Sequence, residues 1–277
     1  MKAARLARGA ALALVWALAA SGCALEQIRS AGREYEPEVG QEGKDVIWVP
    51  TPQPVVNKML DMAKVTPQDY VIDLGSGDGR LVISAAKRGA RALGIEYNPD
   101  MVEFARRRAA EEGVSERATF IKADLFESDF SQATVVTMFL LPSINLKLRP
   151  KILDLKPGTR IVSNSFDMGD WQPDQTGKVV NGCGGYCTAY LWIVPAKVAG
   201  VWRLPQGELT VKQSFQTISG ILKSGDKAVP VSGRLNGDQI SFSAGGARYA
   251  GRVDGNRMQG TVQSGENSSE FSATRVN

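Results

Sequence analysis

Val71-Ile-Asp-Leu-Gly-Ser-Gly-Asp-Gly-Arg80 is the stretch of sequence that decides the fold. The apolar run from Tyr70 to Leu74 ends at glycines, which predicts a buried strand, and residues 80–88 predict a helix. Glycine has no Cβ, so the turn between them can adopt φ > 0 and let a ligand approach the backbone. The N–H groups at the helix start can face that ligand. Alone, this unit is a weak signal, because a glycine-rich turn can also be a simple tight connection.

Acidic residues follow the next two predicted strands as well. Glu96 ends the strand predicted over 92–96, 23 residues after Asp73, and Asp124 follows the strand predicted over 118–122. Open α/β sheets bind ligands beyond the carboxyl ends of their strands, and an acid at the end of the second strand can bind both ribose hydroxyls. The three acids therefore indicate a shared ligand site. The alternative is that they are three solvated loop acids.

Strand and helix patterns alternate through residues 46–196. This alternation predicts an α/β fold with a Rossmann-like, mostly parallel sheet that ends in an antiparallel hairpin. The predicted strands cover residues 70–74, 92–96, 118–122, 133–140 and 159–164, and the hairpin pairs 179–181 with 188–194. The predicted helices after the first one cover residues 98–112 and 143–154.

The sequence pattern changes at about Gly200. Twelve of the 29 glycines lie in residues 200–277, and helical periodicity gives way to short alternating segments. Asn236-Gly237 and Asp254-Gly255 are hairpin turn sequences. The pattern predicts a second, all-β domain over 200–277, an antiparallel meander that closes into a small barrel.

Composition excludes several kinds of chemistry. The 277 residues include no histidine, which excludes histidine triads, histidine general bases and histidine metal ligands. Three cysteines cannot form a four-cysteine zinc site or a disulfide scaffold, so we expect no metal. The formal net charge is +4 and falls to +1 without residues 1–22, which carry three cations and no acid. Such a small excess does not indicate nucleic acid as a partner.

The first 22 residues have the order of a secretory signal. Basic residues precede a small and apolar run over 9–20, and small residues follow it. The run is 12 residues long, shorter than the roughly 20 that span a bilayer. We therefore expect residues 1–22 to be a signal and residues 23–45 to be a tether.

The glycine loop and its acids identify a family. Asp73-Leu-Gly-Ser-Gly-Asp-Gly79, with Glu96 and Asp124, resembles the class I S-adenosylmethionine-dependent methyltransferases. The resemblance implies S-adenosyl-L-methionine as the cofactor, with its methionine part at Asp73 and the glycine loop, its ribose at Glu96 and its adenine at Asp124. The residues that it implies for cofactor binding are Thr51, Asp73, Gly75, Ser76, Gly77, Gly79, Glu96, Asp124 and Leu125.

A narrower resemblance concerns the methyl acceptor. Pro50-Thr-Pro52 and Phe139-Leu-Leu-Pro142, with the glycine loop, resemble the lysine methyltransferases of the mitochondrial ATP synthase c-subunit and, more distantly, the Dot1 type. This implies transfer to a protein lysine or another amine. Many amine methyltransferases have Asn or Asp before Pro-Pro-aromatic here, and this chain lacks that amide. We interpret Phe139, Leu140, Leu141 and Pro142 as the acceptor channel; the alternative is simple strand core.

Nearby polar residues are further candidates for the acceptor side. Ser143 and Asn145 follow the acceptor channel sequence and are candidate substrate contacts. Asp167 and Asp170 follow the fifth predicted strand, where they can orient an amine or form a turn.

The cysteines bear on the compartment. Leu18-Ala-Ala-Ser-Gly-Cys23 resembles a bacterial lipoprotein signal, which implies lipidation of Cys23 and a membrane anchor on the periplasmic face. The alternative is cleavage near Ala24 and a soluble product. Cys183 and Cys187 flank Gly-Gly-Tyr at the predicted hairpin turn and can pair in an oxidising compartment, or remain two free thiols.

Two other functions stay open. A dinucleotide-dependent oxidoreductase would need a third glycine at G-x-G-x-x-G spacing, which is absent, and would give Asp124 no role. A non-catalytic envelope binding protein is favoured by a conflict: the signal exports the chain, whereas S-adenosylmethionine is made in the cytoplasm.

Overall fold

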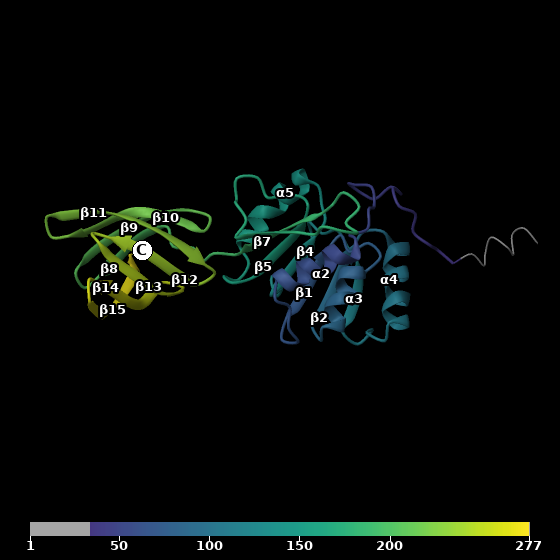
Figure 1. Ribbon diagram of the computed structural model, residues 1–277, viewed down its shortest axis with the longest axis horizontal. Coiled ribbons are helices and arrows are strands. Elements are labelled where there is room, and N and C mark those ends of the chain that lie inside the picture. Colours follow the sequence, from purple (N-terminus) through teal and green to yellow (C-terminus); the bar gives the residue numbers. More distant parts are fainter. Residues whose placement is uncertain (1–33, 277) are drawn as a thin grey trace, which may run out of the picture. The chain divides into compact units, whose positions relative to one another are not determined.

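The computed structural model describes residues 34–276. The predicted signal over 1–22 and the predicted lipidation site Cys23 lie outside the described residues. Within the described part, a seven-stranded α/β sheet precedes an eight-stranded closed barrel (Figure 1).

The α/β sheet has the strand order β3-β2-β1-β4-β5-β7-β6. Strands β1 to β5 pair in parallel, and β7 runs antiparallel to both β5 and β6. The prediction of a mostly parallel sheet with a terminal antiparallel hairpin is confirmed. The strands are β1 (Tyr70–Leu74), β2 (Arg91–Glu96), β3 (Ala118–Lys122), β4 (Val135–Met138), β5 (Arg160–Asn164), β6 (Gln175–Lys178) and β7 (Thr188–Ile193).

Helices cover both faces of this sheet. The apolar sides of α2, α3 and α4 share one core with one face of the sheet, and α5 packs in a second core on the other face. α4 begins where the Asn98 side chain accepts hydrogen bonds from the N–H groups of Asp100 and Met101, with Pro99 in the first turn. The helices are α2 (Gln53–Met62), α3 (Arg80–Lys87), α4 (Pro99–Glu111) and α5 (Pro142–Leu153).

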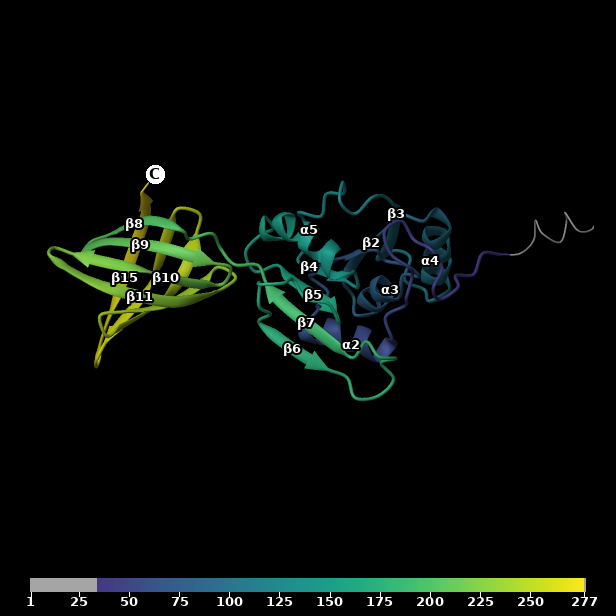
Figure 2. The ribbon, with the colours of Figure 1, turned by 90° about the horizontal axis from the view of Figure 1, so that it is seen from above.

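Two predicted strands differ from the structure. β4 ends at Met138, so Phe139 and Leu140 leave the sheet toward α5 instead of extending the strand to residue 140. The first strand of the terminal hairpin is β6, Gln175–Lys178, and not 179–181 (Figure 2). β6 is a polar edge strand in which only Gly177 is buried, whereas Val180 is 89% exposed. The apolar residues of 179–181 therefore led to a wrong position for the first strand of the hairpin.

The all-β part is a closed antiparallel barrel, as predicted. Its strands alternate buried and exposed side chains, and the interior is filled by residues that include Trp202, Phe242, Tyr249 and Phe271. At Gly220 and Gly260, a Cβ would lie 2.0–2.1 Å from a carbonyl oxygen of the neighbouring strand, so these glycines permit a close approach of the two backbones. The strands are β8 (Gly200–Leu204), β9 (Gly207–Ser214), β10 (Thr217–Ser224), β11 (Lys227–Asn236), β12 (Gln239–Ala244), β13 (Ala247–Asp254), β14 (Arg257–Ser264) and β15 (Asn267–Val276).

The barrel contacts the segment that follows β5. The Phe215 ring stacks on Trp171 with centroids 5.8 Å apart, and Gln216 Nε2 donates to the Gln172 carbonyl over 2.8 Å. Arg234 forms an ion pair with Asp174 at 2.6 Å.

Candidate cofactor pocket and acceptor side

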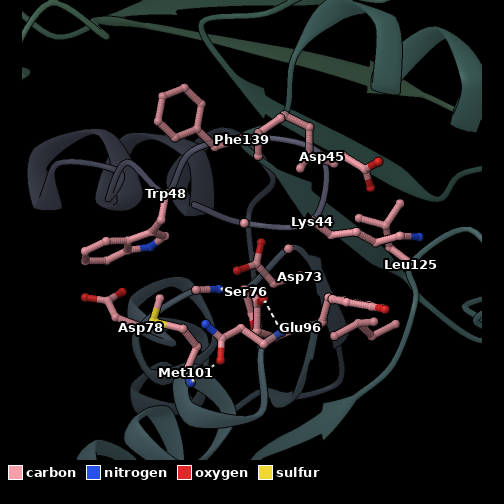
Figure 3. A pocket seen from close by; sticks show the side chains of 18 of the residues that line it. Lys44, Asp45, Trp48, Asp73, Ser76, Asp78, Glu96, Met101, Leu125 and Phe139 are labelled. Atoms are coloured by element: carbon pink, nitrogen blue, oxygen red, sulfur yellow. Dashed lines mark hydrogen bonds between the residues drawn. The ribbon is translucent and has the colours of Figure 1, made fainter. Parts of the chain in front are cut away.

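A pocket lies at the carboxyl ends of β1, β2 and β4. All but one of the residues predicted to bind the cofactor line it, the exception being Gly79. Figure 3 shows Trp48 and Leu125 on opposite sides of the view, with Asp73 and Glu96 between them. Parallel strands bring the three acids to one edge of the sheet, because each acid follows the end of its own strand.

The glycine loop needs its glycines for two different reasons. Gly77 has φ +51°, and a Cβ there would lie 2.4 Å from Trp48 Nε1, so this residue allows Trp48 to lie against the loop. Gly79 has φ +79° at the start of α3, and a Cβ there would lie 2.8 Å from the Phe120 ring. Gly79 therefore lets α3 pack closely on the sheet and does not line the pocket.

A buried acid that sequence reasoning missed fixes the glycine loop. Asp78 accepts hydrogen bonds from Arg80 and forms an ion pair with Arg108 at 2.7 Å. Arg80 also donates from Nη1 to the carbonyl oxygen of Thr51 over 2.9 Å. This network joins the loop to α4 and to the segment before α2. The Asp-Gly-Arg order was visible in the sequence, but Arg108 is 30 residues further on.

Glu96 is held by backbone donors on both sides. Its Oε2 accepts from Gly77 N and its Oε1 accepts from Asn98 N, each over 2.9 Å. A carboxylate oxygen can accept a second bond, so both oxygens can also accept from hydroxyl groups.

Asp73 is the most deeply buried acid of the pocket. Burial raises the pKa of its carboxyl group to about 7, and the nearby Glu96 and Asp78 carboxylates contribute to this rise. The hydrogen bond from the Thr137 hydroxyl, 2.7 Å long, lowers the pKa and so opposes the rise. A nearby cation would favour the ionised form. The group is therefore poised to gain charge when a positively charged ligand binds.

Asp124 pairs with a residue of the N-terminal segment. Lys44 Nζ donates to Asp124 Oδ2, and Phe126 N donates to Oδ1 over 2.9 Å. The Lys44 bond holds the pKa of the Asp124 carboxyl group below its usual range, and the same bond raises the pKa of Lys44. Because a carboxylate has roughly four acceptor positions, about two remain for an adenine amino group.

The N-terminal segment that carries Lys44 covers the pocket. Glu42 and Ile47 form an antiparallel bridge, and Trp48 exchanges backbone hydrogen bonds with residues 40 and 41. Residues from Gln41 onward line the pocket, whereas the sequence predicted a tether up to residue 45. A polar segment interrupted by glycines resembles a linker in the sequence, because the surface that it contacts in the fold is formed by residues far away along the chain.

The four predicted acceptor-channel residues separate into two pairs. Phe139 and Leu140 line the pocket, and a Cβ at Gly75 would lie 3.1 Å from the Leu140 side chain. Leu141 is 43% exposed at the start of α5, and Pro142 lies in the first turn of that helix; neither lines the pocket. Because the chain turns into α5 at Leu141, only the first two residues face the pocket.

The other polar candidates have structural partners. Asn145 is fully buried and donates to the carbonyl oxygens of Phe166 and Asp167, so it holds a loop. Asp167 accepts from the N–H of Gly169, and Asp170 is paired with Arg149, whose bond lowers the pKa of the Asp170 carboxyl group. None of these residues, nor Ser143, lines the pocket.

Cys183 and Cys187 form a disulfide, with Cα atoms 4.9 Å apart. Among residues 34–276, no cluster of three or more potential ligands could hold a metal ion. In the same range, no helix has the length and apolarity needed to cross a membrane.

Comparisons with known proteins agree with this geometry. Residues 73–175 match the family described as the ANTKMT methyltransferase domain. The chain is 45% identical over 152 residues to a protein-lysine N-methyltransferase of Saccharolobus islandicus, covering 94% of that protein and 54% of this chain. It is 36% identical over 141 residues to the lysine N-methyltransferase of the ATP synthase c-subunit from Homo sapiens, covering 60% of that protein and 50% of this chain.

A solved structure is similar as well. An RNA methyltransferase from Salinibacter ruber, crystallised with S-adenosyl-L-homocysteine, has 51% sequence identity and a TM-score of 0.51. The match covers 96% of that chain and 54% of this one. The barrel begins at Gly200, beyond the residues that match the family.

The sheet order and the pocket define a class I methyltransferase that uses S-adenosyl-L-methionine. The chain belongs to the family of the protein-lysine N-methyltransferase of S. islandicus. The family membership therefore supports methyl transfer and argues against a dinucleotide-dependent oxidoreductase.

The residues of the pocket fit this cofactor. Ser76 lines the pocket, and its Oγ, which would lie 2.5 Å from a Cβ at Gly94, is buried without a hydrogen-bond partner in the described part of the chain. Three acids, Asp73, Glu96 and Asp124, line the pocket and supply the acceptors that an ammonium group, a ribose and an adenine amino group need. The individual residue roles stay predictions.

Proposed function

We propose that this protein transfers a methyl group from S-adenosyl-L-methionine to the ε-amine of a lysine in another protein. The observation that carries the proposal is that Phe139 and Leu140, the apolar residues after β4, line the same pocket as Asp73 and Glu96. The names of the S. islandicus and human relatives support a lysine acceptor. The chain covers 60% of the length of the human relative.

The bound cofactor supplies a methyl group on a sulfonium, already activated for attack by a nucleophile. The residues of the pocket need only bind and align the two reactants. Asp73, Glu96 and Asp124 orient one partner, and Phe139 and Leu140 form the apolar wall toward the other.

The amine must be neutral to attack. A free lysine has a pKa of about 10.4, and an apolar wall favours the uncharged form. The lysine ammonium first releases one proton to solvent. The lone pair of the neutral amine then forms the N–C bond as the C–S bond breaks, which leaves a thioether and a methylammonium. Phe139 and Leu140 therefore act through desolvation and alignment, without a general base.

Transfer of labelled methyl from the cofactor to cell extract tests this function. The full chain is incubated with extract treated with either ribonuclease or protease, and labelled protein is hydrolysed for amino-acid analysis. We expect ribonuclease-resistant label that is recovered as N-methyllysine. Label that is lost with ribonuclease would overturn the lysine acceptor in favour of RNA, the substrate class for which the S. ruber enzyme is named. Glu96→Ala, which lacks the predicted ribose contact, is the negative control.

We further propose that the chain is exported and lipid-anchored through Cys23. The pattern of residues 1–22 supports export, and the Cys183–Cys187 disulfide is typical of an oxidising compartment. Intact-mass analysis of protein from the native envelope tests this. Cleavage before Cys23 with added acyl chains supports the anchor, whereas retention of residues 1–22 in a cytosolic fraction would overturn it.

A further inference from the structure

Three aromatic side chains from three separate segments meet beside the cofactor pocket. The Phe139 ring lies 5.9 Å from that of Phe166 and 4.9 Å from that of Tyr186, and Phe166 and Tyr186 are 6.4 Å apart, between ring centroids. Phe139 follows β4, Phe166 follows β5, and Tyr186 precedes β7. Phe139 also lines the pocket (Figure 3). This aromatic cluster therefore begins at the pocket wall.

Buried polar groups fix the position of Phe166. Ser163 Oγ donates to the Phe166 carbonyl over 2.6 Å, and Asn145 Nδ2 donates to the carbonyls of Phe166 and Asp167 at 3.4 and 3.0 Å. Ser163 and Asn145 are fully buried. Ser165, directly before Phe166, has φ +59°, a strained conformation for a residue with a side chain. Buried hydrogen bonds and a strained neighbouring residue therefore fix the backbone that carries this ring.

A covalent bond limits the position of Tyr186. The Cys183–Cys187 disulfide closes the loop Gly184-Gly185-Tyr186, and Tyr186 N donates to the Cys183 carbonyl over 2.9 Å. Val179 N donates to the Cys187 carbonyl over 2.8 Å, which ties the loop to the end of β6. Tyr186 therefore reaches Phe139 from a cross-linked loop.

We propose that Phe139, Phe166 and Tyr186 form the entry site for the acceptor, which receives the alkyl chain and the ammonium of a lysine, and that the disulfide holds Tyr186 in it. Aromatic faces attract ammonium and methylammonium cations and also pack on alkyl chains. The three rings are half-buried, so a side chain from solvent can reach them. The lysine specificity rests on the function proposed above.

Kinetics of aromatic variants test the entry site. In the full chain, Tyr186→Leu and Phe166→Leu should each raise the KM for a lysine peptide by roughly 3–30-fold. Tyr186→Phe keeps the ring face and should keep the wild-type KM. The matched control is Tyr190→Leu, which removes a ring on β7 that contacts Trp192 and not the cluster. The Kd for S-adenosylmethionine should stay within about twofold, which separates acceptor binding from unfolding.

Reduction tests the disulfide. Dithiothreitol, or the double variant Cys183→Ser/Cys187→Ser, should raise the acceptor KM severalfold at an unchanged cofactor Kd, and the reductant should not affect the double variant further. An unchanged KM on reduction would overturn the role of the disulfide.

A binding titration separates this inference from the proposed function. A peptide with Nε-trimethyllysine should bind the full chain more tightly than the same peptide with its neutral tert-butyl isostere, and Tyr186→Leu should abolish the difference. Equal affinities in the wild type, together with unchanged KM values in the variants, would overturn the entry site. The wild type could transfer labelled methyl to RNA and not to lysine, and still bind the trimethyllysine peptide more tightly than its isostere. That result would overturn the proposed lysine methylation but not the entry site.

Discussion

Thr137 donates a hydrogen bond from its hydroxyl group to Asp73 Oδ1 over 2.7 Å, from the middle of the sheet to the floor of the cofactor pocket. Both residues are buried, and they lie directly opposite each other on the paired strands β1 and β4. The bond stabilises a carboxylate whose burial otherwise favours the neutral form. Thr137 therefore adjusts the pH at which Asp73 becomes charged.

Asp73→Asn should weaken cofactor binding and stabilise the free protein at alkaline pH. The pKa of Asp73 is raised to about 7, whereas an unfolded aspartate ionises near about 3.9. Between these values the unfolded state holds fewer protons, so the free energy of unfolding falls as pH rises from about 4 to 7 and is level above that. The variant lacks this loss. Thermal melting of the free proteins should show Asp73→Asn more stable than wild type at pH 8, with the difference shrinking toward pH 4.

The same group sets the pH dependence of cofactor affinity. If Asp73 binds the ammonium of the methionine part, wild-type affinity should rise as pH increases from 6 to 8, and Asp73→Asn should lose roughly tenfold or more at pH 8. Thr137→Val removes the bond that favours the charged form and should move the midpoint of this rise to higher pH. An affinity independent of pH in the wild type would contradict the assignment.

Glu96→Ala should weaken S-adenosylmethionine binding by roughly 1–3 kcal/mol, because hydrogen bonds to the ribose are lost. Isothermal calorimetry measures the change. Glu103→Ala is the control, since Glu103 pairs with Arg106 on the exposed side of α4 and does not line the pocket. An equal loss in both variants would argue against a ribose contact at Glu96.

Gly77→Ala should impair the cofactor site far more than Gly113→Ala. Both glycines have positive φ, at +51° and +66°, so each alanine costs about 1–2 kcal/mol of backbone strain. The space around Gly113 is open, whereas the Cβ at residue 77 would displace Trp48. Calorimetry should show at least a severalfold higher cofactor Kd for Gly77→Ala and an unchanged Kd for Gly113→Ala. Similar cofactor affinities in the two variants would refute a role for the Gly77–Trp48 contact.

Arg234→Gln should lower stability without changing the cofactor site. Arg234 is half-exposed and pairs with Asp174, which keeps a second bond to the N–H of Ile193, so we expect a loss of about 0.5–1 kcal/mol. Arg252→Gln, which breaks an exposed pair within the barrel, should cost less. Calorimetric melting and cofactor titration check both effects. A raised cofactor Kd in Arg234→Gln would show that the barrel supports the pocket.

Local sequence was sufficient to predict those elements in which the backbone geometry repeats or a turn requires a particular residue. The strand–glycine turn–helix unit around Gly75 predicted the first turn of the sheet, and parallel strands necessarily bring Asp73, Glu96 and Asp124 to one edge. Alternation between turn sequences predicted the barrel. β6 was missed because an edge strand with a single buried glycine has no apolar pattern to detect.

The sequence by itself determined the fold class and predicted a ligand site at one edge of the sheet, because these follow from the period of the strands and the conformational freedom of glycine. The cofactor was predicted from the resemblance of the glycine loop and its acids to class I methyltransferases. Tertiary structure alone decided which distant side chains meet: Lys44 with Asp124, 80 residues apart, and Phe139 with Phe166 and Tyr186. Such contacts depend on how loops close and where strands end, and a local pattern carries no information about either. For that reason the pocket cover and the aromatic cluster appear only when the chain is folded.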